Sequence, residues 1–98
     1  MPNETPASLR DVIEAAVGIA FLGTSDGRDA VLMLLPPDVV SGIPRMSAAR
    51  LDIMSIVTAC ARYGALDDLV DAIRFHADGT TAMAKLDAVL TKRHRPKR

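Results

Sequence analysis

The chain has 98 residues, of which twelve are acidic and twelve are Lys or Arg, so its formal net charge is zero. That length allows one domain, and a hydrophobic fraction of 49% excludes a wholly disordered chain. Five of the basic residues lie in the last seven positions, which leaves residues 1–91 with a net charge of −5 and argues against a general nucleic-acid-binding domain.

The composition also favours helices and narrows the chemistry. The chain has no Trp and three aromatic residues, and it is rich in Ala, Leu and Met, which are good helix formers that pack closely. Cys60 is the single cysteine, which excludes an internal disulfide or a thiolate zinc cluster and fits a reducing compartment. No apolar run approaches the roughly eighteen residues of a membrane span, and no signal peptide is visible. We therefore expect a cytoplasmic protein without a membrane partner.

The N-terminal third begins with a segment whose sequence predicts no helix or strand. Residues 1–7 contain two prolines and no periodicity, and we expect a flexible leader. Ser8 is a candidate N-cap, and apolar residues recur at helical spacing across residues 9–20, which predicts a helix that ends near Gly23. The sequence at 24–27, Thr-Ser-Asp-Gly, predicts a turn.

Two short helices are expected next. One covers about residues 28–35 and ends at Pro36-Pro37, with an apolar face formed by Val31, Leu34 and Leu35. Pro37 can begin the other, which ends at Gly42 and Pro44 and whose apolar contacts are Val39, Val40 and Ile43.

Three longer helices account for the second half. The clearest covers about residues 48–63, and its inward residues are Ile53, Ile56, Val57 and Cys60. Its outward residues are Asp52, Ser55, Thr58 and Arg62. Gly64 separates it from a helix with an apolar stripe of Leu66, Leu69, Val70, Ile73 and Ala77. The last begins at Thr80 or Thr81 and faces inward with Met83, Leu86, Val89 and Leu90. We predict an all-α fold, a compact antiparallel bundle of about six short helices.

The sequence gives little support for a catalytic site or a metal site. Cys60 and His76 could form a nucleophile and base, but Cys60 occupies a core position and His76 suits the C-terminal end of a helix. A cation site could be formed by Asp67, Asp68 and Asp71, but no loop supplies the further oxygen ligands that such a site needs. The helix dipole favours acidic residues near a helix N-terminus, which accounts for them without a metal. We expect no enzyme, no metal and no cofactor, with a metal- or thiol-dependent enzyme as an alternative.

The basic segment 92–98 has more than one interpretation. It contains no aromatic residue that could stack on bases, and we interpret it as a tail or linker rather than a nucleic-acid contact. The alternative is a small nucleic-acid-binding regulator that uses this tail.

A pattern of residues gives the chain a specific resemblance. It comprises Leu9-x-x-Val12-Ile13, Arg28 ahead of Leu34-Leu35-Pro36, Ile43-x-Arg45, Arg50-Leu51-Asp52 with Ile56-Val57 and Cys60, and Tyr63-Gly64-x-Leu66-x-x-Leu69. This pattern is similar to the bacterial effector-associated domains, in particular the second type, and covers about residues 8–90.

The resemblance implies a death-like six-helix adaptor domain over residues 8–91. Such domains join sensors to effectors (peptidases, TIR domains or NTPases) in bacterial conflict or programmed-death systems, through homotypic contacts in cis or in trans. The implied partner is another effector-associated domain, with self-association possible.

Opposite charges offer candidate contact residues for such an assembly. The candidates for a positive face are Arg28, Arg45, Arg50 and Arg62, and those for a negative face are Asp67, Asp68, Asp71 and Asp78. Two oppositely charged sides would let copies stack head to tail.

Overall fold

The helical prediction is confirmed in a computed structural model that describes the backbone of residues 9–93 and the side chains of residues 9–91. Within these residues there are six α-helices, one short 3-10 helix and no strand. The predicted leader, the Ser8 cap and residues 94–98 of the predicted tail lie outside the described residues.

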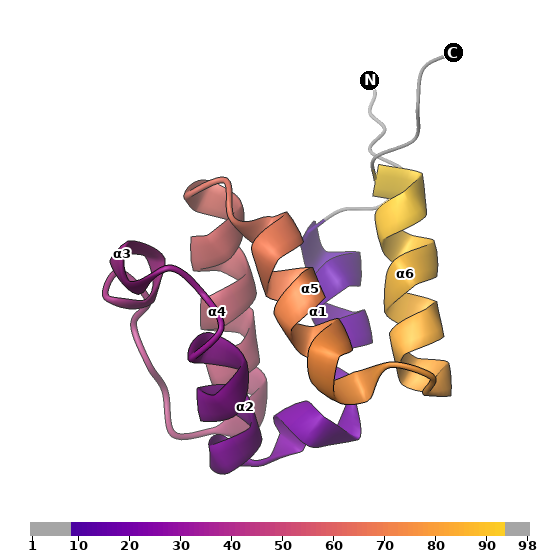
Figure 1. Cartoon of the computed structure of the whole chain (residues 1–98), viewed down its shortest axis with the longest axis horizontal. Coiled ribbons are helices and arrows are strands. Elements are labelled where there is room, and N and C mark those ends of the chain that lie inside the picture. Colours follow the sequence, from indigo (N-terminus) through magenta and orange to yellow (C-terminus); the bar gives the residue numbers. More distant parts are fainter. Residues whose placement is uncertain (1–8, 94–98) are drawn as a thin grey trace.

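The helices form a compact bundle. They are α1 (Leu9–Val17), η1 (Ala20–Gly23), α2 (Ser25–Leu32), α3 (Pro37–Val40), α4 (Ala49–Arg62), α5 (Leu66–Ala77) and α6 (Thr81–Arg93). α1 packs against α6 and α4, α5 packs against α2 and α4, and η1 connects α1 to α2 along the base of the bundle in Figure 1. α3 stands at its edge (Figure 1). None of the described helices combines the length and apolar content needed to cross a membrane.

The core contains the apolar stripes predicted for the three long helices. All four predicted inward residues of α4 and all five of α5 are buried, as are Met83, Leu86 and Leu90 of α6. Val89 is only half-buried. The stripes of different helices close on each other because burying apolar area is the main favourable term in folding.

The predicted first helix is broken after Val17. The Gly18 amide donates to the carbonyls of both Glu14 and Ala15, and the chain then extends through Ile19 before η1 begins. This break allows Ile19 and Leu22 to be buried with Ala16. The apolar periodicity continues across the interruption, so the break itself leaves no signal in the sequence.

The predicted turn at 24–27 is wrong, because these residues start α2. The Thr24 hydroxyl accepts a hydrogen bond from the Gly27 amide at 3.0 Å, which is an N-cap contact. A Cβ on Gly27 would lie 1.8 Å from the Phe21 carbonyl oxygen, so only glycine fits. Thr, Ser, Asp and Gly serve both turns and N-caps, which explains the error.

The apolar face predicted after Arg28 is also partly wrong. α2 ends at Leu32, and the buried residues are Val31, Leu32 and Leu35, whereas Leu34 is 49% exposed. The helix ends three residues earlier than predicted, so Leu34 falls in a turn and points outward. An apolar side chain is thereby left on the surface.

The ends of the later helices agree with the predicted caps. Gly64 has a φ of +70°, and after it the Ala65 amide donates to the Cys60 carbonyl at 2.7 Å, which closes the end of α4. The Thr80 hydroxyl accepts from the Met83 amide at 3.1 Å and caps α6. α6 continues to Arg93, two residues into the predicted tail.

Candidate interaction surfaces

Two residues expected at the surface form a buried ion pair. Arg28, a candidate for the positive face, is 3% exposed, and Asp52, expected to turn outward on α4, is fully buried. The Arg28 Nε atom donates to Asp52 Oδ2 at 2.6 Å, and Arg28 Nη1 donates to the Leu22 carbonyl at 3.0 Å. Arg28 is therefore an interior residue and leaves the candidate contact set.

Asp52 is the centre of a larger set of hydrogen bonds. Arg45 donates to it twice, from Nε at 2.8 Å and from Nη2 at 2.7 Å, and the Met46 amide donates at 2.9 Å. Arg45 also reaches Asp29 on α2 at 2.9 Å. The bonds from Arg45 hold the pKa of Asp52 well below its usual range, helped by the Met46 amide and Arg28, and they raise the pKa of Arg45.

These bonds connect parts of the chain that are far apart in sequence. Asp52 joins α4 to α2 through Arg28 and to the extended segment through Arg45, and Arg28 in turn donates to the Leu22 carbonyl of η1. The Asp52 contacts, together with the Ser55 hydroxyl that donates to the Pro44 carbonyl, hold this segment against α4. Arg28, Arg45 and Asp52 are all part of the sequence pattern described above.

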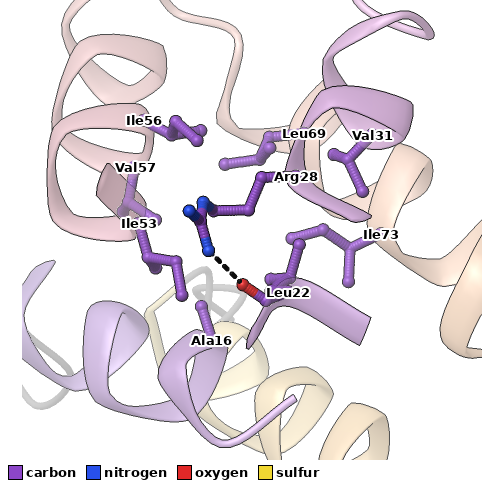
Figure 2. A pocket seen from close by; sticks show the side chains of 9 residues that line it. All are labelled: Ala16, Leu22, Arg28, Val31, Ile53, Ile56, Val57, Leu69 and Ile73. Atoms are coloured by element: carbon purple, nitrogen blue, oxygen red, sulfur yellow. Dashed lines mark hydrogen bonds between the residues drawn. The ribbon is translucent and has the colours of Figure 1, made fainter. Parts of the chain in front are cut away.

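A small cavity lies beside Arg28, and Figure 2 shows its lining. The guanidinium group is surrounded by aliphatic side chains of α1, α4 and α5 and bonds to the Leu22 carbonyl. The cavity volume is about 10 Å³, which is about the space that one water molecule needs. It is a packing space in the core and too small for a substrate.

The thiol of Cys60 lies in the core. It is fully buried, and burial together with the charge of Asp68 raises its pKa to about 11. A thiol with such a pKa is protonated at neutral pH and is a poor nucleophile.

The ring of His76 packs against two aromatic side chains. Its ring stacks on Phe21 at 4.4 Å between centroids and meets Phe75 edge-on at 5.2 Å. The described residues contain no group of three or more His, Cys, Asp or Glu that could hold a metal ion.

The remaining seven candidate contact residues are all exposed. Arg45 precedes α4, Arg50 and Arg62 lie on α4, Asp67, Asp68 and Asp71 lie on α5, and Asp78 follows α5. Arg50 pairs with Glu14 and Asp71 pairs with Arg74. Among the described residues, neither Arg62 nor Asp68 forms an ion pair.

Apolar side chains gather beside Arg62 on the outer face of α4. Met46, Leu51 and Met54 are each more than a third exposed, and with Pro44, Thr58 and Arg62 they line a shallow groove of about 320 Å³. We call these six residues the α4 groove. It combines two adaptable methionine side chains with the positive charge of Arg62, which has no ion-pair partner within the described residues.

A second apolar group lies beside Asp68. Leu34 and Pro36 from the turn after α2 line a depression together with Asp68, Asp71 and Phe75 of α5. We call these five residues the α5 surface. Phe75 is 74% exposed, so this surface carries a projecting aromatic ring with negative charge next to it.

Sequence reasoning identified the charges of both surfaces but missed their apolar residues. Leu51, Met54 and Phe75 lie outside the predicted apolar stripe of their helix. A large apolar residue at such a position can itself indicate a binding surface. Leu34 was assigned to the core because α2 was predicted to be too long.

The family model for effector-associated domain 2 matches residues 13–91. No curated protein and no solved structure matches the chain significantly. The match extends over the helices that form the core and over both surfaces, and the chain therefore belongs to the effector-associated domain 2 family.

Proposed function

We propose that this domain is a non-catalytic adaptor, which couples an effector to its regulator by binding another effector-associated domain. The effector is a peptidase, a TIR domain or an NTPase in a bacterial defence or programmed-death system. The observation that carries the proposal is the exposure of apolar side chains on two surfaces of a closed bundle, beside Arg62 and Asp68, which form no ion pair with any other residue that the structure describes. Such surfaces are typical of protein–protein contacts.

Other features support a role in binding rather than in chemistry. Cys60 and His76, the two groups with catalytic potential, are engaged in core and aromatic packing. As part of the proposal we place the domain in the cytoplasm, where an unpaired cysteine stays reduced.

A binding experiment tests the adaptor role directly. The full chain, labelled at its N-terminal amine, is titrated with purified effector-associated domains of the same type, some fused to effectors, and fluorescence anisotropy is recorded. We expect saturable binding to at least one of them. Leu51→Asp should weaken that binding, whereas Lys85→Glu, an exposed change on α6 outside both surfaces, should not.

The proposal is wrong if the folded chain binds none of these domains, itself included. It is also wrong if the isolated chain shows a catalytic turnover that Cys60→Ala abolishes and that accounts for its effect on an effector.

A further inference from the structure

We infer that the α4 groove and the α5 surface bind each other between two copies of this chain, so that copies associate head to tail. The inference rests on the proposed adaptor function and specifies its contact. The partner is a second copy because one copy carries both halves of a complementary pair: a groove with a positive charge and a projecting aromatic ring with a negative charge.

Charge complementarity is the first part of the argument. Arg62 in the groove and Asp68 on the α5 surface are exposed, and neither has an ion-pair partner among the described residues. Arg50 and Asp71 lie nearby but are each paired within the chain, with Glu14 and Arg74, so the complementary charges are those of Arg62 and Asp68. Opposite potentials on two surfaces orient a partner and exclude contacts between equal surfaces.

Shape and apolar content are the second part. Phe75 projects from α5, and large aromatic residues are the usual anchors of protein interfaces. The flexible side chains of Met46 and Met54 line the α4 groove and can adapt to a ring. On binding, each surface would remove the exposed apolar side chains of the other from contact with water.

Because the two surfaces are different, their contact determines whether the assembly can grow beyond a dimer. They share no residue: the groove is formed by α4 and the segment before it, and the α5 surface by α5 and the turn after α2. A contact between two different surfaces leaves one of each free at the ends of a dimer. Further copies can therefore add, and the product is an open chain or a closed ring rather than only a dimer.

Sedimentation velocity on the full chain and five variants tests this inference. Leu51→Asp removes the groove and Phe75→Asp removes the ring, and each leaves the other surface intact. Both residues are at least half exposed, so the fold should survive, as circular dichroism will verify. Lys85→Glu is the matched control, and Arg62→Glu provides a second way to disable the groove.

We expect the unmodified chain to associate increasingly between about 10 µM and about 1 mM, which corresponds to a binding free energy of roughly −4 to −7 kcal/mol. Leu51→Asp and Phe75→Asp should each weaken association at least about tenfold, the effect of losing one interface anchor. Mixed in equal amounts, they should form a dimer that does not grow, because one functional groove meets one functional ring. Arg62→Glu mixed with Asp68→Arg should also associate, and this mixture should grow beyond a dimer, because the groove and the α5 surface of each copy then meet an opposite charge on the other variant.

Three results would overturn the inference. One is an unmodified chain that stays monomeric throughout this range. Another is association of either variant at the level of the unmodified chain. The third is a mixture that stays monomeric, which would indicate a symmetric contact or a groove filled by the chain itself. A monomeric chain that still binds another effector-associated domain would overturn only this inference and leave the adaptor function standing.

Discussion

The substitution Asp52→Asn should destabilise the fold strongly, because it removes the charge at the centre of the buried ion pair. Each carboxylate oxygen of Asp52 accepts two hydrogen bonds: Oδ1 from Arg45 Nε and the Met46 amide, and Oδ2 from Arg28 Nε and Arg45 Nη2. Whichever oxygen the amide NH2 group replaces, it faces two donors. Two of the four bonds are lost, and Arg28 stays buried without its counter-charge.

The expected size of the effect follows from that geometry. Removing one partner of a buried ion pair costs about 3–5 kcal/mol. This is a large part of the roughly 5–15 kcal/mol by which a small domain is stable. For a chain of this size it lowers the midpoint of thermal unfolding by more than about 12 °C.

Urea unfolding followed by far-UV circular dichroism measures the loss, with Asp29→Asn as the control. The Asp29 carboxylate is 55% exposed and accepts one bond from the same Arg45, so its removal should cost less than about 1 kcal/mol. Equal losses of unfolding free energy for Asp52→Asn and Asp29→Asn would refute the role assigned to the buried pair.

The same residue determines a pH dependence. The pKa of Asp52 is lowered on folding, chiefly by Arg45, so its contribution to stability is complete above the ordinary aspartate pKa of about 3.9. Below that value the unfolded chain binds a proton that the folded chain does not, and stability falls as the pH falls. The unmodified protein should lose stability between about pH 4 and pH 2 more steeply than Asp52→Asn, as urea midpoints at each pH will reveal.

Three further expectations concern the interior. Gly27→Ala should cost more than about 1–3 kcal/mol, since its Cβ would overlap the Phe21 carbonyl, whereas Gly23→Ala, with nothing within 4 Å, should be tolerated in the same thermal melts. Cys60 should not react with a disulfide reagent at neutral pH until urea unfolds the chain; fast labelling of the folded protein would contradict its burial and its pKa of about 11. Arg28→Met combined with Asp52→Asn should lose less stability than the two single changes added together; strict additivity in urea would exclude coupling through the ion pair.

The sequence was sufficient for the fold wherever helices are long and one-sided. The spacing of Ile53, Ile56, Val57 and Cys60 predicts both α4 and its buried face, and glycine at position 64 predicts its end. The prediction was wrong at Thr24–Gly27, because the same residue types form both turns and helix N-caps. It was also wrong at Gly18, where the helix breaks although the apolar pattern continues.

The candidate site was predicted less completely, because a charge pattern does not distinguish a surface residue from a buried one. Arg28 and Asp52 are 24 positions apart, and nothing in their local sequence indicates that they meet in the core. The exposure of Leu51 and Phe75 depends on how α4 and α5 are rotated, and that of Leu34 on where α2 ends; packing decides both. The acidic residues of α5 and the basic residues of α4 remain where the sequence suggested, on the outside.

Anisotropy titration of the labelled full chain with a second effector-associated domain, compared for the unmodified protein and Leu51→Asp, tests the adaptor account most directly. Saturable binding that the variant loses, while its circular dichroism spectrum is unchanged, is the predicted result. Equal binding by both proteins would mean that the α4 groove is not the contact, and absence of binding by either would contradict the adaptor function itself.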